Sequence, residues 1–116
     1  MTDPLRAPGS AHAVIRRTLI ATRRGQVHVR MCGDSTARVP LVLLHMTPMS
    51  SAMYDPLLPL FGRDRLAIAP DRPGFGFSDM PDRPLSIAEY ADAALDVLDR
   101  LGVERFDVLG THTGSV

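Results

Sequence analysis

The sequence predicts an α/β fold in which an antiparallel hairpin leads into a parallel sheet flanked by helices. Residues 39–44, 66–69 and 106–109 are short, almost continuously apolar runs, which is typical of strands buried on both faces. A helix-like segment, 86–101, separates the second run from the third, and an alternating pair of segments precedes the first. Strands that alternate with helices form βαβ units and therefore a parallel sheet.

The hairpin is predicted at the start of the organised part of the chain. Residues 14–21 read as a strand, residues 24–25 (Arg-Gly) as a turn, and residues 26–32 as a second strand in which polar and apolar side chains alternate. His28 falls on the polar positions of that alternation, so we expect it to be exposed to solvent. Cys32 is the single cysteine and has no partner for an internal disulfide, so we expect it to be a buried strand residue.

Two helical segments are predicted. The clearer one begins at Ser86, whose hydroxyl forms a capping box with Glu89, and ends at Gly102. Its apolar residues are expected to form one buried stripe, with three aspartates outside it: Ile87, Ala91, Ala94, Leu95, Leu98 and Leu101 in the stripe, and Asp92, Asp96 and Asp99 outside. Residues 51–61 predict a short helix that two prolines keep irregular.

The composition is that of one small globular domain, with 116 residues of which 45% are hydrophobic and 22% charged. The 13 basic and 13 acidic residues balance, so we expect neither nucleic acid nor a membrane as a partner. No run approaches the ~20 apolar residues of a spanning helix. Residues 1–13 are rich in Pro, Ala and Gly, so we expect a flexible tail rather than a secretion signal, and a cytoplasmic protein.

Polar and glycine-rich segments follow each predicted buried strand, where open α/β sheets bind ligands. Residues 45–48 read His-Met-Thr-Pro, residues 71–79 read Asp-Arg-Pro-Gly-Phe-Gly-Phe-Ser-Asp, and residues 110–114 read Gly-Thr-His-Thr-Gly. In this order they resemble the H-G-x-P oxyanion loop, the D-x-x-G-x-G-x-S-D loop and the G-x-S-x-G nucleophile elbow of the α/β-hydrolase family, close to its haloalkane dehalogenase and epoxide hydrolase members (the AB hydrolase-1 type). The resemblance covers about residues 14–116, which correspond to the N-terminal half of the family's domain and end at the elbow.

The resemblance implies roles for individual residues. His112 occupies the nucleophile position, and the backbone amides of Thr47 and Thr113 would form the oxyanion hole. The remaining matched positions are structural loop residues, namely His45, Asp71, Gly74, Gly76, Gly110 and Gly114. The implied partner is a small-molecule substrate or ligand, with no cofactor and no metal.

The chain departs from the family pattern at three points. The elbow carries His112 in place of Ser, Asp or Cys, Met46 replaces the oxyanion-loop glycine, and the sequence stops at Val116, before the family's acid and base. Because the triad chemistry needs all three groups together, we expect this chain to be inactive, while a complete form would hydrolyse a small ester, epoxide or halide. The alternatives are a non-catalytic member of the fold that binds a small ligand or partner, and a pseudogene remnant.

Two further hypotheses concern the edge of the sheet. His45, Asp71 and His112 would end three adjacent strands, so a non-haem metal site is conceivable there, although we favour loop-bracing hydrogen bonds for the first two residues. The strand that ends at Leu109 would lie at the edge of the sheet in this chain. An apolar edge strand is an aggregation hazard, so we expect poor solubility or self-association through that edge.

Overall fold

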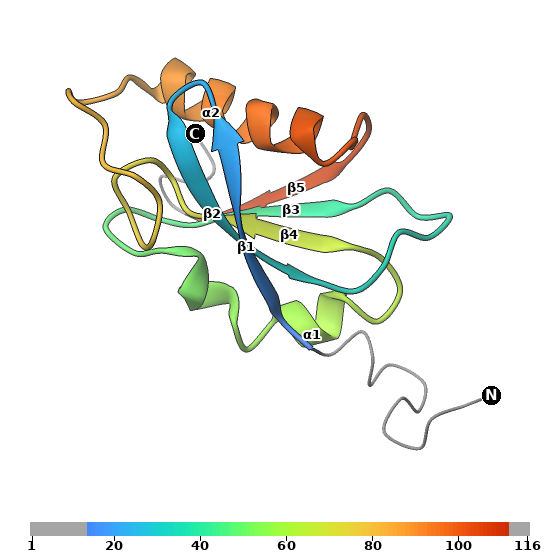
Figure 1. Ribbon diagram of the computed structural model, residues 1–116. Coiled ribbons are helices and arrows are strands. Elements are labelled where there is room, and N and C mark those ends of the chain that lie inside the picture. The colour runs from blue at the N-terminus through green and yellow to red at the C-terminus, as the bar shows by residue number, and fades with distance from the viewer. Residues whose placement is uncertain (1–13, 112–116) are drawn as a thin grey trace.

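The computed structural model describes residues 14–111 of the chain and has the predicted α/β architecture (Figure 1). Its elements in chain order are β1 (Arg16–Thr22), β2 (Gly25–Cys32), β3 (Leu41–Leu44), the 3₁₀ helix η3 (Ser51–Tyr54), α1 (Leu58–Phe61), β4 (Ala67–Pro70), α2 (Ile87–Arg100) and β5 (Asp107–Gly110). The predicted flexible tail, residues 1–13, lies outside the described residues.

The strands form one five-stranded sheet in the order β1-β2-β4-β3-β5. β2 pairs antiparallel with β1 and with β4, whereas β3 pairs parallel with both β4 and β5. The predicted sequence of an antiparallel hairpin followed by parallel strands is therefore confirmed. Because the chain crosses over, β3 lies between β4 and β5, the two strands that follow it in the sequence.

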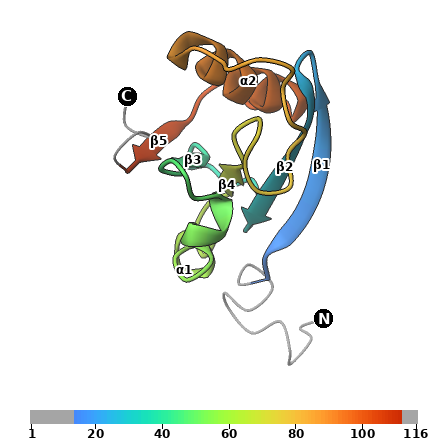
Figure 2. The ribbon, with the colours of Figure 1, turned by 90° about the vertical axis from the view of Figure 1, so that its left-hand side faces the viewer.

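The sheet is covered on both faces, which explains why its inner strands read as continuous apolar runs. Figure 2 shows α2 over one face, and η3 and α1 over the other. Val42 and Ile68 point to the α2 side and belong to one buried cluster with Val97. Leu43 points the other way and packs in a second cluster with Tyr54. Alternate residues of each strand thus serve two separate cores.

The segment between β3 and β4 is irregular, as its prolines predict. η3 is a single turn whose N-terminus is capped by the Ser50 side chain, which accepts a hydrogen bond from the Ala52 amide at 3.2 Å. α1 follows after a break and is only four residues long. Tyr54 and Leu58 are nevertheless fully buried, at 2% and 0% exposure, so this short segment supplies the core of its face.

Helix α2 begins as predicted but turns a different face to the sheet. Ser86 and Glu89 form the predicted capping box, since the Ser86 hydroxyl accepts from the Glu89 amide and the Glu89 carboxylate accepts from the Ser86 amide. The predicted single stripe is wrong in part. Leu98 is buried, but Ile87, Ala91 and Leu95 are exposed, and the buried positions include Ala93 and Val97 instead. The helix carries two adjacent apolar faces, and only one of them meets the sheet.

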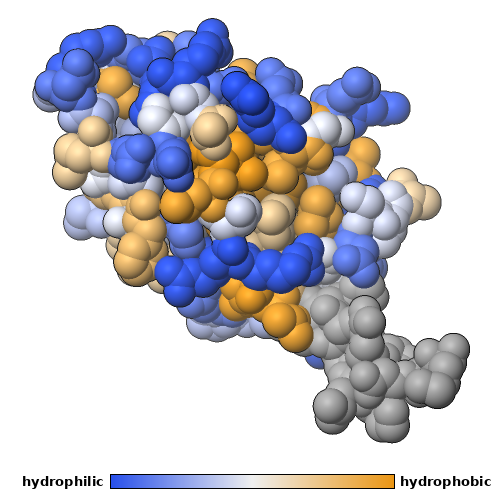
Figure 3. All heavy atoms as spheres, in the orientation of Figure 1, coloured by the Kyte–Doolittle hydropathy of each residue, from blue (hydrophilic) through white to orange (hydrophobic). Residues whose placement is uncertain are grey.

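The sheet has β1 at one edge and β5 at the other. Val108 on β5 is 55% exposed, so the β5 edge presents an uncovered apolar side chain, and Leu95 on α2 is 49% exposed. Figure 3 shows hydrophobic residues also gathered in the middle of one face, bordered by hydrophilic residues. None of the helices within residues 14–111 has the length and apolar character that crossing a membrane requires.

Candidate functional site

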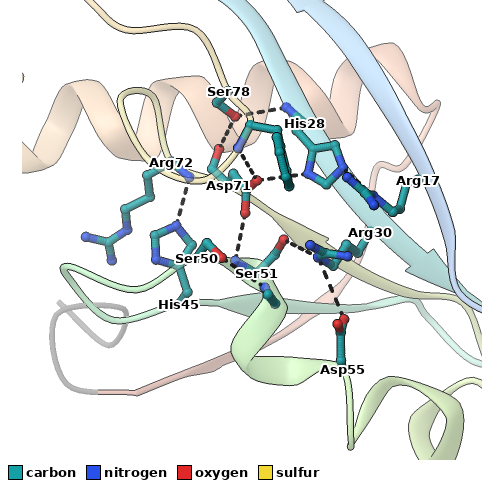
Figure 4. Close-up of polar contacts among 12 residues, drawn as sticks. Arg17, His28, Arg30, His45, Ser50, Ser51, Asp55, Asp71, Arg72 and Ser78 are labelled. Atoms are coloured by element: carbon teal, nitrogen blue, oxygen red, sulfur yellow. Dashed lines mark hydrogen bonds and ion pairs between the residues drawn. The ribbon is translucent and has the colours of Figure 1, made fainter.

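The polar segments that follow β3 and β4 meet at the carboxyl edge of the sheet, around the carboxylate of Asp71 (Figure 4). This side chain is 1% exposed. Its Oδ1 accepts a hydrogen bond from the Ser51 amide at 2.7 Å, and its Oδ2 accepts from the Phe77 amide at 3.0 Å and from His28 Nδ1 at 2.8 Å. One carboxylate thereby ties together strand β2, the start of η3 and the loop after β4.

The environment of Asp71 holds this carboxylate in its charged form. Burial by itself raises the pKa, but hydrogen bonds from the Ser51 side chain, the Phe77 amide, the Ser51 amide and His28 outweigh it. The pKa of Asp71 is therefore below its ordinary value of 3.8. A buried carboxylate with this many donors acts as a fixed anionic anchor rather than as a proton carrier.

His28 is not the solvated strand residue that the alternation of β2 predicts. Its side chain is buried, at 4% exposure for the residue, because β2 is covered by the loop after β4. Nδ1 contacts Asp71, and Nε2 accepts from Arg17 Nε at 3.1 Å. Since a guanidinium can only donate, Nε2 carries no proton, and the neutral ring donates from Nδ1 to the carboxylate. The Phe77 ring packs edge-on against the imidazole, with a centroid distance of 5.2 Å.

His45 links the two loops that follow β3 and β4. It is fully buried, its Nε2 accepts from the Arg72 amide at 2.9 Å, and its Nδ1 lies 3.0 Å from the Met46 carbonyl oxygen, to which it donates. Burial lowers the pKa of His45, and this outweighs the opposing effect of the Met46 carbonyl. The ring is thus a neutral bridge with both nitrogens in use.

Two positions in the loop after β4 have backbone conformations that favour glycine. Gly76 has φ +54°, and a Cβ placed there would lie 2.2 Å from Asp71 Oδ2. Gly74 has φ +86° and closes the loop through its amide, which donates to the Asp79 carbonyl at 2.9 Å. Gly76 is therefore required twice, because it adopts a left-handed conformation and because only a hydrogen fits beside the carboxylate.

The loop after β3 borders a cleft of about 220 Å³. Thr47 lines this cleft together with Arg72 from the loop after β4 and Tyr90 from α2, while the rest of the lining is mainly apolar. The Arg72 guanidinium lies over the Tyr90 ring, 5.5 Å from its centroid. The Met49 amide donates to the Met46 carbonyl at 2.8 Å, so residues 46–49 form a tight turn in which Met46 is accommodated.

The structure places part of the predicted elbow. Gly110 is the last residue of β5 and pairs in register with Leu44 of β3. His112, Thr113 and Gly114 lie outside the described residues. β4, β3 and β5 are adjacent in the sheet, so His45, Asp71 and the elbow follow neighbouring strands, as expected.

The described residues contain no group of three His, Cys, Asp or Glu side chains placed to hold a metal ion. His45 and Asp71, the two described members of the metal hypothesis, are both engaged with protein partners. A metal ion would have to displace the Arg72 amide or the Met46 carbonyl from the His45 ring.

Comparison with known proteins identifies the scaffold. A family model of the alpha/beta hydrolase fold matches residues 39–115, a stretch that includes all three motifs. This chain belongs to the α/β-hydrolase fold family. The chain is 31% identical over 114 residues to the 2-hydroxymuconate semialdehyde hydrolase of Pseudomonas sp. (strain CF600), covering 95% of this chain and 38% of that protein. It is 41% identical over 86 residues to the juvenile hormone epoxide hydrolase of Bombyx mori, covering 67% and 19% of the two chains.

Solved α/β-hydrolases superpose closely on the same region. The epoxide hydrolase CorEH matches with a TM-score of 0.81 and 26% identity, over 87% of this chain and 35% of that one. The N-acyl homoserine lactonase AidH matches with a TM-score of 0.78 and 31% identity, over 87% and 38% of the two chains. The chain therefore spans little more than a third of the length of these relatives.

Three residues of this region carry no signal in the sequence pattern. His28 falls on a polar position of an alternating strand, and Tyr54 lies within the predicted short helix of residues 51–61. Ser51 was treated only as the start of a helix, although its amide holds Asp71 and its hydroxyl accepts from Arg30 Nε at 3.1 Å. No local signal distinguishes these residues, because each partner lies at least 10 residues away in the sequence.

Proposed function

We propose that this chain forms the first part of a hydrolase that acts on a small ester, lactone, epoxide or halide. One observation carries the proposal: the ends of β3 and β5, which lead into the oxyanion loop and the elbow, are held side by side. Leu44 pairs with Gly110, and the Tyr54 hydroxyl contacts both the Leu44 carbonyl and Thr111 Oγ1. An acyl-transfer site needs this proximity, because its oxyanion donors come from both segments. The relatives, which include an epoxide hydrolase and a lactonase, support the substrate class.

The proposal includes that the 116-residue chain by itself does not hydrolyse substrate. His28 and His45 are the only histidines within residues 14–111, and both use their two ring nitrogens in hydrogen bonds. Neither is free to act as the general base for the elbow residue. A cytoplasmic location and a small-molecule partner, without nucleic acid or membrane binding, belong to the same proposal.

The test compares the 116-residue chain with the product of the complete gene, each with His112 and as His112→Ser, on p-nitrophenyl acetate and a terminal epoxide. We expect turnover by the complete product in at least one of these two forms, and none by the 116-residue chain. Turnover by the 116-residue chain would refute the proposed inactivity. If the complete product is inactive in both forms, the enzyme proposal fails, and ligand binding without catalysis takes its place.

A further inference from the structure

The phenol of Tyr54 sits at the junction of the two segments that build the proposed oxyanion site. Its ring is buried in the core beneath the sheet, at 2% exposure. Its hydroxyl donates to the Leu44 carbonyl at 2.8 Å and lies 3.1 Å from Thr111 Oγ1. With its single proton given to the carbonyl, the phenol oxygen accepts from the Thr111 hydroxyl. Tyr54 therefore joins two strands that are far apart in sequence.

The Tyr54 bridge lies where the pairing of β3 with β5 ends. β3 and β5 run parallel in register from Leu41 opposite Asp107 to Leu44 opposite Gly110, and the paired ladder stops there. The Tyr54 bridge contacts the last paired residue of β3 and the first residue beyond β5. Beyond Leu44 the first segment enters the loop that contains Thr47, and Thr111 is the first residue after β5. The bridge thus fixes the separation of the two segments at the end of the paired ladder.

We infer that Tyr54 is a positioning residue, which sets the distance between the oxyanion loop and the nucleophile elbow through its hydrogen bonds to Leu44 and Thr111. Its side chain is not among those that line the cleft beside Thr47. Oxyanion donors are effective only when they are held at hydrogen-bond distance from the developing charge, so a small change in this separation lowers turnover. The kinetic part of the inference rests on the proposed hydrolase function.

The kinetic test uses the product of the complete gene, in whichever form is active, and removes single hydroxyls. Tyr54→Phe and Thr111→Val each remove one side of the bridge and keep the side-chain shape, whereas Thr111→Ser keeps the hydroxyl. We expect the first two variants to lower kcat on the order of 10-fold with KM within about twofold, and the double variant to be no worse than either. Thr111→Ser is expected to stay near the parent.

Thr36→Val is the matched control, since the Thr36 hydroxyl also donates to a backbone carbonyl, that of Asp64 at 2.8 Å. Thr36 lies before β3, at the opposite end of that strand, and its loss should leave kcat unchanged. The inference is overturned if Tyr54→Phe lowers only the melting temperature, or if Thr111→Ser loses as much turnover as Thr111→Val.

A second measurement is independent of activity and decides the inference even if the complete product does not hydrolyse anything. Hydrogen exchange followed by mass spectrometry should show faster exchange in Thr111→Val for peptides that cover residues 44–50 and 108–114. Peptides from β1 and β2 should be unchanged. Equal acceleration in all peptides, or no change in either of the two segments, would show that the bridge does not position them.

Discussion

The contact between Gly76 and Asp71 predicts a large loss of stability for Gly76→Ala. An alanine at φ +54° pays about 1 kcal/mol for the left-handed conformation. Its Cβ would also lie 2.2 Å from Asp71 Oδ2 and 2.4 Å from Cγ, so the carboxylate must move away from the Phe77 amide and His28. Loss of hydrogen bonds to a buried charge adds about 2–3 kcal/mol, for a total of about 3–4 kcal/mol.

Gly102→Ala separates the two contributions. Gly102 ends helix α2 with φ +74°, but a Cβ there meets nothing within 4 Å, so only the conformational cost of about 1 kcal/mol applies. Urea unfolding of both variants, followed by far-UV circular dichroism because the chain has no Trp, gives the difference directly. If Gly76→Ala unfolds at the same urea concentration as Gly102→Ala, the steric argument for the Asp71 anchor is wrong.

Three further outcomes are expected. Ser86→Ala removes the capping box of α2 and should lower the free energy of unfolding by about 1 kcal/mol in the same urea assay. The free energy of unfolding should fall as the pH drops below about 6.5, because His45 is protonated in the unfolded chain but stays neutral in the folded core. It should fall again below about 4, where Asp71 loses its charge. In urea titrations across this range, His45→Gln should remove the fall that begins near pH 6.5. We also propose that the β5 edge drives self-association: Val108→Lys should lower the mass measured by light scattering. Leu60→Lys should not, although Leu60 on α1 is about as exposed as Val108, at 52% against 55%.

The lowered pKa values of His45 and Asp71 both predict that acid destabilises the folded chain. Both groups have folded-state pKa values below their unfolded ones, so each contributes stability at higher pH that is lost on acidification. A protein whose urea midpoint rises between about pH 7 and pH 5 would contradict the assignment of His45 as a buried neutral bridge.

Local patterns were sufficient to predict the helices and strands and the edge of the sheet at which the polar motifs lie. The capping residues of α2, the irregular segment broken by prolines and the buried parallel strands all depend on neighbours within a few residues, so the sequence predicts them. The side of α2 that meets the sheet could not be predicted in this way. Ile87 and Ala93 lie on different faces of one helix, both apolar, and only the position of the helix on the sheet selects between them.

By itself, the sequence determined the α/β class, the order of the strands and helices, and the three family motifs at the carboxyl edge of the sheet. Each of these features depends on residues that are close together in the sequence, either through a periodic pattern or through a contiguous motif. Only the tertiary structure decided that His28 is buried on Asp71, that both described histidines are occupied, and that Tyr54 joins β3 to β5. Apart from the bond between the neighbours His45 and Met46, these contacts connect residues 10 to 57 positions apart, and they form only when the crossover brings distant strands together.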